Sequence, residues 1–240
     1  MQYTDNSCLF AVMSTAEFRE RKEEFAYKKE MLHSLGSIRY CKAELFKECI
    51  LGTIRLPQKN EQKKAQLSFG FYLTGRKVFF VEDEGKMKAW IEKQTEMFQE
   101  VDTPKQLLLR IMEHMIEEDT LYFSHMESEL DKLEEKISGG TGSNNNFFTS
   151  LIKHRQKLSE FNIYYEQLID IAELFSTCDF YQSEQDTQGW DRFMHRVEQL
   201  QNHVHLLREN VLQIRELYQS MQDAHQNKIM AVITIVTTIF

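Results

Sequence analysis

Apolar residues are spaced differently in the two halves of the chain. Over the first hundred residues, short apolar stretches with strand composition alternate with polar segments. The predicted strands are residues 8–14, 40–46 and 49–56, and a hairpin over 66–83 with its turn at 74–77. Residues 15–35 and 86–100 have the composition of helices. This pattern predicts a small α/β domain over residues 1–101.

Long helices are predicted from residue 102 onward. Thr103 can cap the first of them, Pro104 suits its first position, and Gln106 stands three residues after the cap. We expect this helix to continue unbroken to Ile137, where the glycine and asparagine cluster of residues 138–146 ends it. A second helix is predicted over residues 147–178, and a third from Trp190 to the end of the sequence.

The third helix carries a seven-residue apolar repeat, which is typical of a coiled coil. Its members are Phe193, Val197, Leu200, Val204, Leu207, Val211, Ile214, Tyr218 and Met221. This seam can pack on other subunits or on the two preceding helices of the same chain. We favour packing between subunits, because a helix of about fifty residues, roughly 75 Å long, extends beyond those two helices.

The sequence ends on the apolar stretch "IMAVITIVTTIF", residues 229–240. Twelve helical residues cover about 18 Å, which is less than the roughly 30 Å hydrocarbon core of a membrane. Because the stretch ends without a glycine cap or a basic residue, we interpret residues 227–240 as the truncated start of a first transmembrane helix.

The expected fold class is therefore α+β. It combines the N-terminal α/β domain, 1–101, with a helical domain, 102–226, that contains the long coiled-coil stalk.

Composition narrows the possible functions. The net charge of −8 argues against nucleic acid as a partner, because phosphate binding needs clustered Lys and Arg. The four cysteines are widely spaced and include no C-x-x-C pair, which favours a reducing, cytosolic environment without a zinc ribbon. The sequence has no secretory signal, phosphate loop, nucleophile elbow or H-E-x-x-H motif, so we expect no enzymatic activity.

Three functions compete at this point: the cytosolic part of a membrane channel or transporter, a membrane tail-anchored coiled-coil adaptor, and a soluble metal-dependent enzyme. The end of the long helix resembles the CorA family of magnesium channels, whose stalk helix enters the bilayer through a similar string of residues. The matching residues, in register without gaps, are Glu216, Tyr218, Asn227, Met230, Ile233, Thr234, Ile235, Thr238, Ile239 and Phe240. The acidic helix pair before the stalk is also similar to that family, and the α/β half is compatible with it.

The resemblance implies a homopentamer that is funnel-like when assembled, with the stalk helices continuing as pore helices. It implies transport of Mg²⁺, which is also a possible regulatory ion, with no organic cofactor. Co²⁺, Ni²⁺ and Zn²⁺ remain open as alternative cargo. The full-length protein would lie in the cell (plasma, or inner) membrane, with this portion cytoplasmic. The runner-up is the tail-anchored adaptor without transport activity.

The resemblance and the helical spacing together predict a pore-facing side of the long helix. Its residues recur every three or four positions and so share one face. They are Glu216, Ser220, Asp223, Asn227, Met230, Ile233 and Thr237. Repeated around a pore, Glu216 and Asp223 would form acidic rings, and Met230 with Ile233 an apolar constriction that can close by dewetting. The alternative is that these residues only pack or face solvent.

A regulatory metal site is a further expectation. Many family members sense Mg²⁺ with a His-Pro-Leu-x-x-Glu-Asp motif, which is absent here, so that Glu30 and His33 are the nearest candidates. On the stalk, Asp191 and His195 resemble the family's Asp-x-x-x-His, but only after a shift of one residue. Without that shift, Arg192 occupies the aspartate's position. Both pairs are therefore candidate metal ligands. The alternative for Asp191 and His195 is that they are a pair of surface residues without a metal.

Overall fold

The computed structural model of the 240-residue chain describes residues 9–21, 25–59, 67–94, 101–138, 144–178 and 184–239. The chain forms two compact units. The first unit comprises residues 1–119 and 163–201, and the second comprises residues 120–162 and 202–240. The domain boundaries expected from the sequence, at 101/102 and 226/227, remain a prediction.

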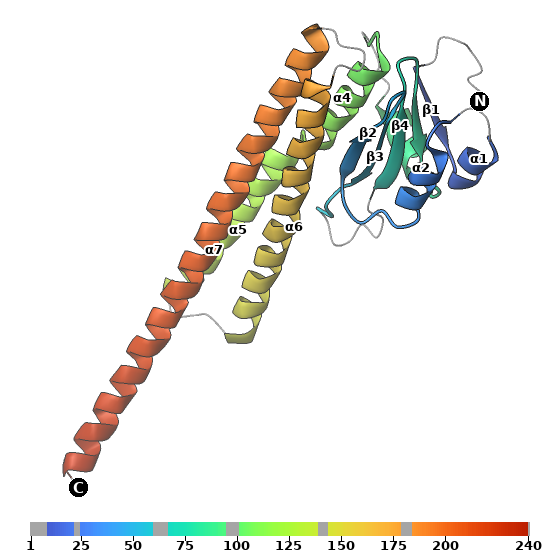
Figure 1. Cartoon of the computed structure of the whole chain (residues 1–240). Helices are drawn as coiled ribbons and strands as arrows, with labels where there is room; N and C mark the ends of the chain where they lie inside the picture. The colour runs from blue at the N-terminus through green and yellow to red at the C-terminus, as the bar shows by residue number, and fades with distance from the viewer. Residues whose placement is uncertain are drawn as a thin grey trace. The chain divides into compact units, whose positions relative to one another are not determined.

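A five-stranded sheet forms the centre of the first unit (Figure 1). Its strands are β1 (Phe10–Met13), β2 (Lys42–Leu45), β3 (Ile50–Arg55), β4 (Ser68–Leu73) and β5 (Val78–Val81), in the order β1-β5-β4-β3-β2. β1 runs parallel to β5, and the other pairs are antiparallel. The predicted hairpin is present, and the Thr74 hydroxyl donates to the Lys77 carbonyl at 2.9 Å across its turn.

Three short helices accompany the sheet: α1 (Thr15–Glu20), α2 (Lys28–Leu35) and α3 (Lys86–Lys93). The single helix predicted over residues 15–35 is wrong, because Tyr27 takes a left-handed conformation (φ 55°) before α2. The Tyr27 ring packs on Phe46, with centroids 4.4 Å apart, which is a contact that sequence spacing does not reveal. Residues 95–100 of the helix predicted to follow residue 86 lie outside the described residues.

A glycine in β3 is required by close packing. A Cβ at Gly52 would lie 2.2 Å from Phe71 Cζ and 2.5 Å from the Lys42 carbonyl oxygen. We expect Gly52→Ala to lower the free energy of unfolding by about 1–3 kcal/mol, because the backbone of β2 would have to move. Chemical denaturation measures this loss. Gly36→Ala is the control, since φ is −59° there and a Cβ would meet its nearest atom at 3.5 Å. Equal stability of the two variants would contradict the prediction.

Four longer helices follow: α4 (Pro104–Met115), α5 (Asp119–Ser138), α6 (Asn144–Thr177) and α7 (Glu184–Ile239). The predicted start of α4 is confirmed, because the Thr103 hydroxyl accepts from the Gln106 amide at 3.1 Å. The expectation of one unbroken helix to Ile137 is wrong, since α4 ends at Met115 and α5 begins at Asp119. α7 begins six residues earlier than predicted and includes Gly189, where a Cβ would lie 2.7 Å from Leu109 Cδ2.

The apolar seam of α7 is buried within the chain as far as Tyr218. In the first unit, Trp190 stacks on Phe175 of α6 at 4.3 Å, and Phe193 packs edge-on against Trp190. In the second unit, parts of α5, α6 and α7 lie side by side (Figure 1), and Tyr218 stacks on Phe147 of α6 at 4.8 Å. The expectation that this seam packs between subunits is therefore wrong for Phe193 to Tyr218, because these residues are buried within the single chain. The α+β class with a long C-terminal helix is confirmed.

Candidate functional site

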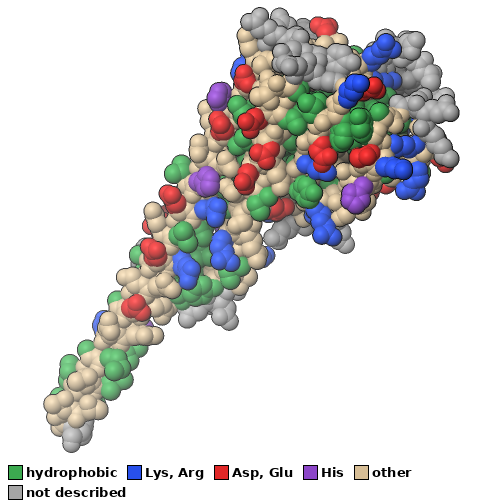
Figure 2. All heavy atoms as spheres, in the orientation of Figure 1, with side chains coloured by type: hydrophobic (Ala, Val, Ile, Leu, Met, Phe, Trp, Pro, Cys, Tyr) green, Lys and Arg blue, Asp and Glu red, His purple; other side chains and the backbone are tan. Residues whose placement is uncertain are grey.

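The environment of α7 changes after Tyr218. Every side chain from Asp223 to Ile239 is exposed, and from Ile229 onward these residues are apolar or threonine. Figure 2 shows hydrophobic side chains at this end of the helix, while the acidic ones on the same face stop short of it. No helix in the described ranges has a stretch both long and apolar enough to cross a membrane. The structure thus contains a helix end whose apolar side chains are uncovered.

The residues predicted to face a pore all lie on this segment or just before it. Glu216, Ser220, Asp223, Asn227, Met230, Ile233 and Thr237 are all exposed. Met230 and Ile233 are large apolar side chains with exposed fractions of 61% and 50%. Because the segment is one continuous helix, the spacing places these residues on one face, as the sequence indicated. Their role in conduction stays a prediction.

The threonines of this segment direct their hydroxyls to the helix backbone. Thr234 donates to the Met230 carbonyl at 2.9 Å, and Thr237 to the Ile233 carbonyl at 3.0 Å. Thr238 donates to the Thr234 carbonyl at 2.6 Å. Such bonds satisfy the hydroxyl donors inside the helix, so that threonine can remain in apolar surroundings. The sequence did not reveal this arrangement, which makes the end of α7 more apolar than its composition suggests.

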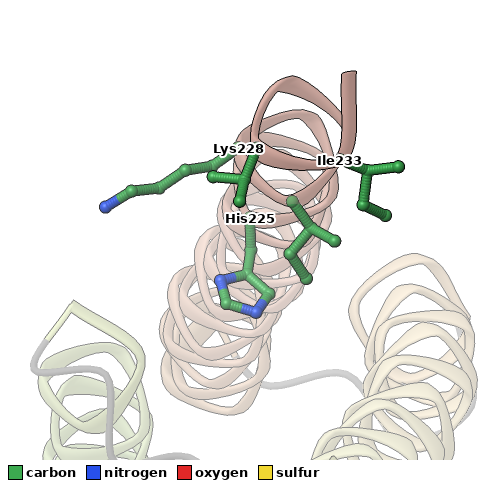
Figure 3. Close-up of a pocket in the computed structure, with 5 residues that line it drawn as sticks. His225, Lys228 and Ile233 are labelled. Atoms are coloured by element: carbon green, nitrogen blue, oxygen red, sulfur yellow. The ribbon is translucent and has the colours of Figure 1, made fainter. Parts of the chain in front are cut away.

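A shallow hollow of about 340 Å³ lies along the same segment. Its lining residues are His225, Lys228, Ile229, Val232 and Ile233, all from α7. The close-up in Figure 3 shows the labelled side chains of His225, Lys228 and Ile233 projecting from this one helix in different directions. The hollow is therefore a feature of an exposed helix surface and has no enclosing walls from a second element.

The candidate regulatory ligands do not converge on a metal site. Asp191 is half-buried and His195 is exposed, with its Nδ1 3.0 Å from a carboxylate oxygen of Glu198. Glu30 and His33 are exposed on α2. Within the described parts of the chain, no group of three or more His, Cys, Asp or Glu side chains is placed to hold a metal ion. His195 and Glu198 form an ion pair only when the imidazole is protonated.

A charged cleft of about 410 Å³ lies between α4 and the start of α7 in the first unit. Arg110 and Arg192 contribute guanidinium groups to its lining, and Asp102, Glu113 and Asp186 contribute carboxylates. Arg110 pairs with Glu113 at 3.3 Å, so part of this charge is neutralised within the cleft. Arg192 is thus part of a mixed ionic surface.

One polar cluster in the first unit was not predicted. Asp119 is fully buried at the start of α5; its carboxylate pairs with Lys59 and accepts from the Tyr165 hydroxyl at 2.7 Å. Burial raises the pKa of Asp119, while Lys59, Tyr165 and Arg196 act in the opposite direction. In the sequence, Asp119 stands in the acidic run "EEDT" and carries no sign of burial. Only its distant partners distinguish it from its neighbours.

A buried thiol lies at the edge of the sheet. The Cys41 amide donates to the Gln167 side chain of α6 at 2.8 Å, and burial raises the pKa of the Cys41 thiol to about 12. The thiol is therefore protonated at neutral pH and is not a nucleophile.

The fold and the exposed helix end define a class of protein in which a sheet domain is joined to a long helix with an apolar terminus. The sequence model of one family, described as CorA-like Mg²⁺ transporter protein, matches residues 29–240. The chain belongs to this family. No curated protein sequence matches this chain.

Several solved structures share this fold. The complete CorA magnesium transporter from Methanocaldococcus jannaschii aligns with a TM-score of 0.81 and 16% identity, covering 100% of this chain and 78% of the transporter. The full-length CmaX protein aligns with a TM-score of 0.79 and 15% identity, covering 99% and 75%. The ZntB cytoplasmic domain from Vibrio parahaemolyticus aligns with a TM-score of 0.69 and 10% identity, covering 90% and 88%. At these identities the likeness concerns the fold alone.

Proposed function

We propose that this chain is the cytoplasmic regulatory part of a homopentameric divalent cation transporter, with Mg²⁺ as its cargo. In this proposal α7 continues into the membrane as a pore-lining helix, and the assembly gates ion flux through the stalk and pore. The full-length protein would reside in the cell membrane. Transport needs no covalent chemistry, so the chain requires no catalytic residue and no organic cofactor.

The main support for this proposal is that the apolar residues of α7 are buried in one part of the helix and exposed in the next. Its apolar seam is covered by the chain's own helices as far as Tyr218, whereas the apolar side chains from Ile229 to Ile239 are exposed. Burying exposed apolar area is favourable by roughly 25 cal/mol per Å², so this segment is stabilised by a partner outside the folded chain. Other copies of α7 and the lipid of a membrane supply such surroundings, and membership of the CorA-like family favours both.

The chemistry of the exposed face is consistent with passage of a hydrated cation. Mg²⁺ dehydrates reluctantly and is often held through water by oxygen ligands. Glu216, Asp223 and Asn227 carry such oxygens, and all three are exposed on α7. Met230 and Ile233 follow as apolar residues, and a ring of such side chains can close a pore by excluding water. The face therefore combines a region that attracts cations with one that resists their passage.

Assembly of the full-length protein tests this proposal. We expect light scattering in detergent to give the mass of a pentamer, and proteoliposomes to take up Mg²⁺. A strictly monomeric full-length protein would refute the pentameric transporter. A membrane-bound oligomer without ion uptake would instead favour the tail-anchored adaptor.

Regulatory divalent binding is a separate part of the proposal, with Asp191 and His195 as the candidate ligands and Glu30 with His33 as weaker ones. We expect millimolar Mg²⁺ to raise the melting temperature. At a concentration about ten times Kd, a ligand of the folded state adds about 1.4 kcal/mol of stability. For a chain of this length that corresponds to roughly 3–6 °C.

Differential scanning calorimetry with Mg²⁺ measures this shift, and the double variant Asp191→Asn, His195→Gln is the control. The shift should vanish in the double variant. A melting temperature that does not respond to Mg²⁺ in the unmodified chain would eliminate the site.

A further inference from the structure

The junction between α4 and α5 is a helix break that the local sequence does not explain. Residues 105–138 contain no glycine and no proline, and their composition favours one continuous helix. In the structure, α4 nevertheless ends at Met115 and α5 starts at Asp119. The amides of Ile116, Glu117 and Asp119 donate to carbonyls three residues earlier, at 3.1–3.3 Å. The chain thus makes a tight turn where an α-helix would form bonds to carbonyls four residues earlier.

Asp119 is the residue at this break that makes side-chain contacts with distant parts of the chain. Its side chain is 1% exposed, with one carboxylate oxygen paired with Lys59 and the other accepting from Tyr165 at 2.7 Å. Lys59 follows β3, and Tyr165 belongs to α6, so both partners are more than forty residues away in sequence. The neighbouring Glu117 and Glu118 are exposed. Among Glu117, Glu118 and Asp119, the contacts with Lys59 and Tyr165 therefore involve Asp119.

The break also suits the charge of Asp119. As the first residue of α5, Asp119 stands at a helix N-terminus, where the helix dipole and unpaired amides favour a negative charge. In one continuous helix the same residue would be in the interior, where this stabilisation disappears. The helix terminus, like Lys59, therefore offsets part of the cost of burying this carboxylate.

We propose that the Asp119, Lys59 and Tyr165 cluster maintains this break, and that loss of the ion pair between Asp119 and Lys59 shifts residues 104–138 toward one continuous helix. The chain passes from the first unit into the second directly after Asp119. The turn is therefore at one of the three places where the backbone passes between the two units. The proposal adds a conformational element to the protein and does not depend on the proposed transport function.

Protonation of Asp119 is not equivalent to the loss of this ion pair. Burial raises the pKa of Asp119, so the observed, broken arrangement itself favours the protonated carboxyl. The test therefore removes the pair by substitution and not by lowering the pH.

Other titratable groups near the cluster must be distinguished from Asp119. Tyr164 and Tyr165 approach it from α6, Arg196 from α7 and Lys59 from the segment after β3. On the same side of the break, His114 Nδ1 lies 2.7 Å from Glu117, across the turn itself. Substitution of Asp119 leaves each of these groups in place.

The decisive experiment compares Asp119→Asn with Glu118→Gln, which removes an exposed charge one residue earlier. Backbone NMR of the 240-residue chain gives the Cα chemical shifts of Ile116, Glu117 and Glu118, and amide exchange reports the protection of residues 116–119. In Asp119→Asn we expect the shifts to move to helical values and amide exchange to slow by about tenfold or more, as for a turn that gains helical hydrogen bonds. Glu118→Gln should change neither measurement.

Two further measurements keep the proposal testable if Asp119→Asn does not fold. Lys59→Met removes the cationic partner of the pair and should move the Ile116 to Glu118 shifts toward helical values. Tyr165→Phe removes the neutral hydrogen bond and should move the shifts partly in the same direction. A folded Asp119→Asn or Lys59→Met protein with an unchanged turn would overturn the proposal.

Discussion

Met230→Asp in the full-length protein is expected to raise ion flux by about tenfold or more, equivalent to lowering the barrier by about 1.4 kcal/mol. In the proposed pentamer, Met230 forms an apolar ring, and its side chain is 61% exposed on the isolated chain. A ring of carboxylates at that level would hold water and attract cations, so the constriction could no longer exclude them. Fluorescent-dye measurement of Mg²⁺ entry into proteoliposomes checks this result.

Met230→Leu is the matched control for that prediction. It keeps an apolar side chain of similar volume, and its flux should remain close to that of the unmodified protein. If Met230→Asp reaches the membrane in normal amounts and conducts at the unmodified rate, Met230 does not line the pore.

Trp190→Ala is expected to lower the free energy of unfolding by about 3–5 kcal/mol, as for other fully buried aromatic residues. Trp190 is fully buried and stacks on Phe175 with centroids 4.3 Å apart. Phe175 in turn lies 6.4 Å from Phe71 of β4, so the two rings connect α7 through α6 to the sheet. Urea denaturation followed by circular dichroism measures the loss, and the helix and sheet signals should decrease together.

Trp190→Phe keeps an aromatic ring at this position and removes the indole nitrogen, so that the two contributions can be measured separately. The Trp190 Nε1 is buried without a hydrogen-bond partner, so its removal relieves an unsatisfied donor. We expect Trp190→Phe to cost clearly less than Trp190→Ala, because a ring remains on Phe175. Equal losses for the two variants would show that the stacking of Trp190 contributes little.

The parts of the fold that could be predicted are those determined by local chemistry. The Thr103 cap needs only residues within one helical turn, and the hairpin over residues 66–83 needs only its own alternation and turn. The seam of α7 could be identified because its apolar positions repeat on one helix face. These features depend on neighbours a few residues away, and the sequence displays those neighbours directly.

The parts that could not be predicted depend on contacts between distant residues. The break before Asp119 involves Lys59 and Tyr165, and the break before α2 involves the packing of Tyr27 on Phe46. The seam was assigned to the wrong partners because periodicity identifies an apolar face but not what covers it. For the candidate site, spacing and family resemblance placed Met230 and its companions on one exposed face. The backbone bonds of Thr234 and Thr237 depend on side-chain conformation and were not foreseen.

Substitutions in the two sets of apolar residues on α7 should have different effects. Substitutions in the covered set, from Phe193 to Tyr218, act on the folding of each individual chain and should reduce the amount of protein. Substitutions in the uncovered set, from Ile229 to Ile239, leave that folding intact and act on what the finished chain binds. Loss of abundance and loss of activity should therefore map to adjacent segments of the same helix, with Tyr218 near the boundary between them.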